Sequence, residues 1–144
     1  HSIMYKHLEE VKSDYICNNN PCQPFLDIKK VQKVIDWFKE SSYESAITVS
    51  REKNFFWSND LSPLNFLPND RLSTTSGPSV LKATHSLVFY RKDYMLNNWE
   101  LFSNTDCDPY PYLIDWPEEE LIDVDTELDF KLVEKIYEIR SRHR

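Results

Sequence analysis

The chain has 144 residues, a length typical of one domain with a sizeable hydrophobic core. Aromatic residues make up 14% of it and charged residues 28%, which is the composition of a folded rather than a disordered protein. The net charge of −7, without a basic stripe or an apolar run of membrane-spanning length, argues against nucleic-acid polymers and membranes as partners.

The cysteines indicate a reducing compartment. Cys17, Cys22 and Cys107 are an odd number without zinc-ligand spacing, and no signal-peptide pattern opens the chain. We therefore expect a cytoplasmic protein with small, buried, reduced thiols. A catalytic pairing of Cys22 with His85 is the alternative.

Helix and strand patterns alternate along the first third of the chain. A helical apolar face predicts a helix over residues 2–12, and a short apolar run predicts a strand over residues 14–17. A polar turn follows at residues 18–24. Asp27 is placed to cap a second helix that runs to about residue 40, and residues 46–49 form a second predicted strand.

Residues 51–80 break this alternation. Three adjacent aromatic residues, at positions 55–57, lead into a stretch rich in Asn, Ser, Pro and Asp. We expect this stretch to leave the sheet as a long excursion, with a hairpin, that mediates dimerisation.

Regular patterns return in the C-terminal half. Strands are expected over residues 86–90 and, at an edge, 112–114, with a helix over residues 92–101 between them. A last helix is expected from residue 127 to about 141, and its main apolar row is Leu128, Leu132, Ile136 and Ile139.

This order of elements predicts a single α/β domain over residues 1–144, a sandwich with a mainly parallel sheet. Ligands bind at the carboxyl ends of the strands in such sheets. The turn at 18–24 and the pair Asp123 and Asp125 both follow predicted strands, so we expect them to converge on one site.

The most informative motif is the stretch of residues 121–130, where Asp123 and Asp125 alternate with apolar residues and point to one face. Thr126 and Asp129 have the spacing of a capping box at the start of the last helix. Paired carboxylates before a helix are suited to Mg²⁺. The alternatives are a solvated acidic loop, the metal site of a glycosyltransferase, a phosphatase nucleophile or an EF-hand. The short remaining chain disfavours the phosphatase, and Leu128 stands where an EF-hand requires glycine.

The chain has one glycine, Gly77, and therefore no glycine-rich loop that could bind phosphates through its backbone. If the protein handles nucleotides, we expect its phosphate loop to lie outside these residues.

In its motifs and their order the chain resembles the acylneuraminate cytidylyltransferases over nearly its whole length. The resemblance rests on residues 14–15, the Asn-Pro-Cys-Gln-Pro-Phe segment at 20–25, the strand at 45–49 and the Ile-Asp-Val-Asp-Thr motif at 122–126. These enzymes transfer CMP from CTP to a sialic-acid-like sugar and release pyrophosphate. The resemblance implies a three-layer α/β/α sandwich like that of nucleotide-diphospho-sugar transferases, a homodimer, and an N-terminal phosphate-binding part that has no counterpart here.

The resemblance also implies roles for single residues. Asp123 and Asp125 would bind Mg²⁺ and act in catalysis. Asn20 stands where the family has glutamine and would contact the acidic sugar. The family strand Asn-Gly-Ala-Ile-Tyr corresponds to residues 85–89, so His85, Ser86 and Phe89 would line the sugar pocket. We therefore interpret the chain as a CMP-sugar synthetase-like nucleotidyltransferase. Two alternatives remain. The chain could be a truncated, non-catalytic domain that dimerises or binds a partner, which leaves open whether it is an enzyme, or it could be a metal-dependent glycosyltransferase.

Overall fold

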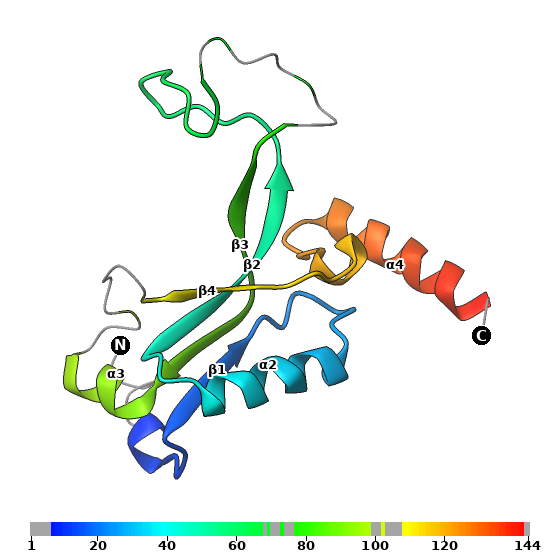
Figure 1. The fold of residues 1–144 in the computed structure, drawn as a ribbon. Helices are drawn as coiled ribbons and strands as arrows, with labels where there is room; N and C mark the ends of the chain where they lie inside the picture. The colour runs from blue at the N-terminus through cyan, green and yellow to red at the C-terminus, as the bar shows by residue number, and fades with distance from the viewer. Residues whose placement is uncertain are drawn as a thin grey trace.

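The computed structural model describes residues 7–67, 69, 73, 77–98, 102 and 108–142. Four strands form one sheet in the order β1-β3-β2-β4 (Figure 1). The strands are β1 (Tyr15–Asn19), β2 (Ser45–Lys53), β3 (Ser79–Arg91) and β4 (Tyr110–Leu113). The last of them lies at an edge, as predicted.

The sheet is mixed rather than mainly parallel. Strand β3 runs antiparallel to both β1 and β2, and only β2 and β4 form a parallel pair. Strands β1, β2 and β4 therefore run in one direction, and β3 runs in the opposite direction between β1 and β2. The physical reason lies in the connection from β2 to β3, whose described residues contain no helix that could carry the chain back for a parallel pairing.

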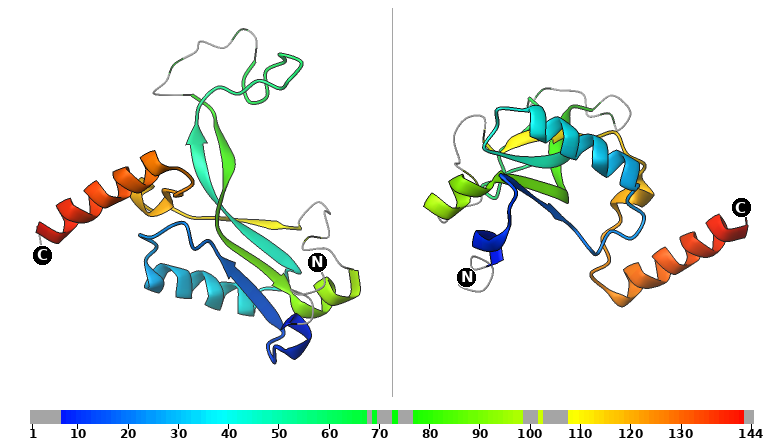
Figure 2. Two further views of the ribbon diagram at one scale, coloured as in Figure 1. Left: turned by 180° about the vertical axis from the view of Figure 1, so that it is seen from behind. Right: turned by 90° about the horizontal axis from the view of Figure 1, so that it is seen from below.

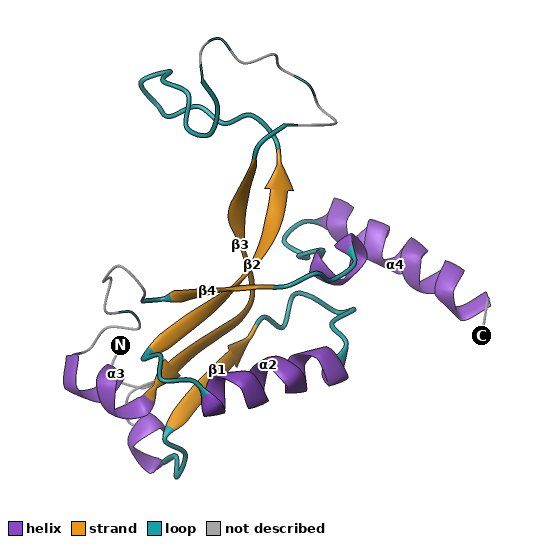
Figure 3. Cartoon of the chain, viewed as in Figure 1, coloured by secondary structure: helices purple, strands orange, loops and turns teal. Residues whose placement is uncertain are grey.

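The helices are α2 (Ile28–Glu40), α3 (Lys92–Asn98), the 3-10 helix η1 (Glu118–Leu121) and α4 (Glu127–Arg142) (Figure 3). The Asp27 side chain accepts a hydrogen bond of 2.8 Å from the Lys29 backbone N–H, which confirms the predicted cap of α2. Residues 7–10 are also helical. The helix predicted over residues 2–12 therefore ends at residue 10, and residues 11–12 are not helical. Its first part, residues 2–6, and the predicted end of the following helix at residues 99–101 lie outside the described residues.

The main core lies between α2 and one face of the sheet. Phe38 is fully buried and stacks on Phe89 of β3, with ring centroids 5.0 Å apart. Burying a side chain of this size contributes about 1.5–3 kcal/mol. Tyr90, the next residue along β3, packs instead with Leu8 and Met95 in a second cluster. The described part of the chain thus has one helix layer over the sheet and a smaller cluster at one end, so a full three-layer sandwich is not confirmed.

A bulge interrupts β3 beside the middle of β2. Ile47 pairs with Val88 while Val49 pairs with Ala83, so Thr48 stands opposite residues 84–87. The Thr48 hydroxyl replaces the missing ladder partner: it donates to the Leu87 carbonyl at 3.2 Å and accepts from its N–H at 3.0 Å. Such bulges redirect backbone groups, and this one turns the carbonyls of residues 84 and 86 away from β2.

Beyond the bulge, β2 and β3 continue past the body as a two-stranded arm (Figure 1). The predicted excursion is therefore shorter than residues 51–80, because residues 51–53 and 79–80 remain paired in the sheet. At the tip, Phe66 packs edge-on against Phe55 and Trp57, with centroids 5.2 and 4.9 Å away. Three leucines stay exposed there: Leu61, Leu64 and Leu67.

Helix α4 projects from the body, as all views in Figures 1 and 2 show. Of its predicted apolar row, Leu128, Leu132 and Ile139 are 75, 51 and 57% exposed, and Ile136 is half-buried. The sequence correctly predicted the helix, but its apolar row does not enter the core. None of the helices in the described ranges is long and apolar enough to cross a membrane.

Candidate functional site

The two aspartates of the acidic motif lie between η1 and α4. Ile122 is extended, with φ −65° and ψ 121°, but the segment 122–125 joins no strand of the sheet. The expectation that these aspartates end a sheet strand is thus wrong, since the short helix η1 separates them from β4. Asp123 is half-buried and Asp125 is exposed.

A capping box fixes the start of α4 directly after these aspartates. Asp129 Oδ2 accepts hydrogen bonds from the Thr126 N–H at 2.8 Å and the Thr126 hydroxyl at 2.7 Å. In return, Thr126 Oγ1 accepts from the Asp129 N–H at 3.3 Å. The bonds from the Thr126 hydroxyl and backbone lower the pKa of Asp129. Asp129 therefore serves as the cap, which leaves Asp123 and Asp125 as the candidate ligands.

The turn after β1 contacts the acidic segment, as the sequence predicted. The Asn20 side-chain Nδ2 donates to Asp123 Oδ2 at 3.1 Å, across 103 positions of sequence. The Val124 N–H donates to the Cys22 carbonyl at 3.0 Å. The side-chain Oδ1 of Asn20 also accepts from the Cys22 N–H at 2.9 Å, which closes the turn.

Asp123 has a second oxygen without a partner. Its Oδ1 is shielded from solvent and accepts no hydrogen bond. A buried acceptor left unpaired costs about 1–3 kcal/mol, so a cation or a donor at this position would relieve the cost. Among the residues that the structure describes, no group of three or more His, Cys, Asp or Glu side chains is arranged to hold a metal. Two carboxylates still suit Mg²⁺, which usually completes its octahedron with waters and substrate phosphates.

The three predicted residues of β3 have different environments. Ser86 is fully buried, and its carbonyl accepts from the Asn20 N–H at 3.0 Å, so the bulge brings it to the turn. His85 is exposed and has a φ of 54°, a left-handed conformation that is uncommon outside glycine. Phe89 is only 1% exposed and lies in the core against Phe38. The expectation that Phe89 lines a pocket is therefore corrected, because the pleat of β3 directs its side chain under α2.

Gln23 is a site neighbour that sequence reasoning missed. It is 4% exposed, and its Nε2 donates to the Thr84 carbonyl at 3.0 Å. Its Oε1, like Asp123 Oδ1, is buried and unpaired. The turn is thus tied to the bulge of β3 at two carbonyls, those of Thr84 and Ser86. No sequence signal indicated this bulge, because a bulge is set by the pairing of strands that are distant in the chain.

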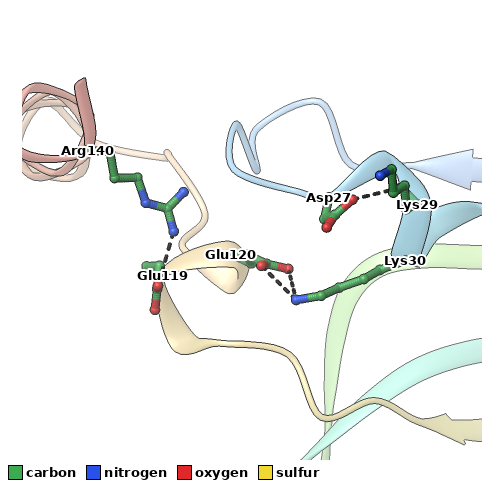
Figure 4. Close-up of polar contacts among 6 residues, drawn as sticks. All are labelled: Asp27, Lys29, Lys30, Glu119, Glu120 and Arg140. Atoms are coloured by element: carbon green, nitrogen blue, oxygen red, sulfur yellow. Dashed lines mark hydrogen bonds and ion pairs between the residues drawn. The ribbon is translucent and has the colours of Figure 1, made fainter. Parts of the chain in front are cut away.

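Two ion pairs hold η1 in place on either side (Figure 4). Lys30 of α2 contacts both carboxylate oxygens of Glu120, at 2.7 and 2.8 Å, and Glu120 is only 8% exposed. Arg140 of α4 lies 3.1 Å from Glu119 and 4.6 Å from the centre of the Phe25 ring. Lys30 and Glu120 lie 90 positions apart, so no local sequence pattern indicated this pair. Since η1 ends two residues before Asp123, the pairs also position the acidic segment.

Two grooves flank η1. The larger, about 930 Å³, lies between the base of the arm and residues 113–122, and Arg51 and Lys82 contribute its cationic side chains. The second, about 670 Å³, lies between the turn at 24–27 and the Phe130, Val133 and Tyr137 face of α4. Neither groove has Asn20, Asp123 or His85 among its lining residues. Ile122 of the acidic segment thus lines the larger groove, whereas Asp123 and Asp125 line neither of the two.

The two described cysteines have different environments. Cys17 is half-buried against the main core, and burial raises its pKa to about 11, so it stays a neutral thiol. Cys22 is exposed, which corrects the expectation of a buried thiol. Cys107 lies outside the described residues.

The mixed four-stranded sheet and the helix that covers it define an α/β fold. The solved structure of 4-diphosphocytidyl-2C-methyl-D-erythritol synthase from Anaerococcus prevotii has a similar fold, with a TM-score of 0.60 and 11% sequence identity. The match covers 94% of this chain and 64% of that chain. No protein-family profile matches the sequence, and no curated protein matches it either. The comparison shows the fold, and this chain spans somewhat under two thirds of its neighbour's length.

Proposed function

We propose that this chain provides the sugar- and Mg²⁺-binding part of a cytidylyltransferase that transfers CMP from CTP to a sialic-acid-like sugar. A sugar hydroxyl attacks the α-phosphorus of CTP, and the bond from that phosphorus to the oxygen bridging to the β-phosphate breaks. Pyrophosphate leaves, and the hydroxyl proton passes to solvent. This protein acts as a homodimer through its arm.

The observation that carries the proposal is the contact between Asn20 and Asp123. It joins two of the four segments that resemble the acylneuraminate enzymes, although 103 positions separate them in the sequence. The fold shared with a synthase named for a diphosphocytidyl product supports the same reaction class.

Each site residue has a separate task in this proposal. Asp123 and Asp125 would hold Mg²⁺, which when bound neutralises charge on the phosphates. Asn20 holds the Asp123 carboxylate, and His85 and Ser86 form the wall of the sugar site next to the turn. We leave Phe89 out of the site because it is buried in the core.

The test is Mg²⁺-dependent release of pyrophosphate from millimolar CTP, with a panel of acidic sugars. We expect release that requires both CTP and a sugar, and the exchange Asp125→Asn should abolish it. Because Asp125 is exposed, the variant should keep the circular dichroism spectrum of the wild type. Asp14→Asn, at another exposed aspartate, is the matched control and should retain activity. Unchanged turnover in Asp125→Asn would refute the metal role.

A second candidate is a non-catalytic domain that binds a partner. The observation in its favour is the apolar row of α4, of which Leu128, Leu132 and Ile139 are more than half exposed. This candidate predicts that no sugar in the panel supports pyrophosphate release, even though the chain folds.

A further inference from the structure

Asn20 has both functional ends of its side chain engaged. The amide orientation follows from the partners: the Cys22 N–H can only donate, so Asn20 Oδ1 faces it, and Nδ2 is left to face the Asp123 carboxylate. The backbone of Asn20 is fixed as well, because its N–H donates to the Ser86 carbonyl at 3.0 Å. Asn20 is therefore held in one orientation from three directions.

This arrangement makes the two oxygens of Asp123 unequal. Oδ2 receives the hydrogen bond from Asn20, while Oδ1 is unpaired and shielded from water. An oxygen without a hydration shell gives up little solvation when a cation binds to it. A cation at Asp123 would thus meet one available oxygen rather than two.

The number of available oxygens discriminates between hard cations. Ca²⁺ takes six to eight oxygens and readily uses a carboxylate in bidentate fashion, whereas Mg²⁺ requires an octahedron and commonly uses single carboxylate oxygens. We infer that Asn20 is a positioning residue which restricts Asp123 to one-oxygen ligation and so favours Mg²⁺ over Ca²⁺. The inference rests on the metal site of the proposed function, and it gives Asn20 a role toward Asp123 in place of the sugar contact that the family resemblance implies.

The test uses the full chain with Mn²⁺ as the spectroscopic probe, and Mg²⁺ and Ca²⁺ as competitors, without nucleotide. Asn20→Ser keeps a short acceptor for the turn but cannot reach Asp123. We expect it to weaken Mg²⁺ competition about 10- to 100-fold, the usual effect of losing a group that orients a metal ligand. Ca²⁺ competition should change much less, so the preference for Mg²⁺ should fall. Asn19→Ser, at the exposed neighbouring position, is the matched control and should behave like the wild type.

A second variant distinguishes a change in metal preference from a defect in folding. Asn20→Asp retains the acceptor for the Cys22 N–H and replaces the donor with another carboxylate, so Ca²⁺ should gain on Mg²⁺ in competition. The inference is overturned if both Asn20 variants keep the wild-type ratio of Mg²⁺ to Ca²⁺ affinity while Asp123→Asn loses Mn²⁺ binding; the proposed metal site would then stand. If the wild type binds no Mn²⁺, both the inference and the proposed metal site fail.

Discussion

Replacing Lys30 should test whether η1 is anchored by its buried ion pair. At 2.7 Å and an effective dielectric constant of about 20, the attraction between Lys30 and Glu120 is about 6 kcal/mol. Moving both charges out of water costs several kcal/mol, which offsets most of that attraction. The exchange Lys30→Met removes the attraction but leaves the Glu120 carboxylate in its buried position.

We expect Lys30→Met to lower the free energy of unfolding by about 2 kcal/mol. This is below the roughly 3–5 kcal/mol typical of fully buried pairs, because the Lys30 side chain keeps 30% of its exposure and water partly screens the site. The corresponding fall in melting temperature is about 4–8 °C. The double variant Lys30→Met with Glu120→Leu should recover most of the loss, because no charge then remains buried.

Urea unfolding followed by circular dichroism measures the free energy of unfolding of the single and the double variant. Lys29→Met, at the exposed neighbouring position on α2, is the matched control and should stay within about 0.5 kcal/mol of the wild type. A loss below about 0.5 kcal/mol for Lys30→Met, or a double variant as unstable as the single one, would show that Glu120 is effectively solvated.

Three further predictions concern the arm, the nucleotide and acid. Light scattering at micromolar concentration should show a dimer, and Leu64→Asp at the arm tip should convert it to a monomer; a wild-type monomer would contradict this. Calorimetry with CTP and Mg²⁺ should show only weak binding, because the chain carries a net charge of −7 and has one glycine. Tight binding would reveal a further phosphate site. Hydrogen bonds from the Ser58 and Ser62 side chains lower the pKa of Asp60 from 3.8 to about 2. Since the folded pKa is depressed, this local stabilisation is present above about pH 4 and disappears as the pH falls through 2. The amide NMR signal of Ser62, whose N–H donates to Asp60, should shift with a midpoint near pH 2; a midpoint near pH 4 would refute the assignment.

Local features were predictable because their causes are local. The cap at Asp27 and the capping box at Thr126 and Asp129 depend on residues within a few positions, and both formed as expected. The turn after β1 does meet Asp123, as expected, but the rule that led to this expectation placed the aspartates at the end of a sheet strand, where they do not lie.

The direction of β3 and the exposure of the apolar row of α4 could not be predicted from local patterns in the sequence. An alternation of strands and helices favours parallel pairing, but the described residues between β2 and β3 contain no helical crossover, and β3 pairs with β2 in the antiparallel direction. The apolar row of α4 indicates a buried face, yet periodicity cannot say which surface would cover it. Phe89 was misplaced because its direction depends on the register across the bulge at residues 84–87.

The strand order has a consequence for a chain that is cut at the arm tip, for example beside the exposed Leu64. One fragment would hold β1 and β2, and the other β3 and β4. In the sheet these strands interdigitate, since β3 lies between β1 and β2, and β2 lies between β3 and β4. Neither fragment can keep a strand pair of its own, because every neighbouring pair joins one fragment to the other. A nicked chain should therefore stay together as a noncovalent complex, and the two halves, made separately, should fold only when mixed.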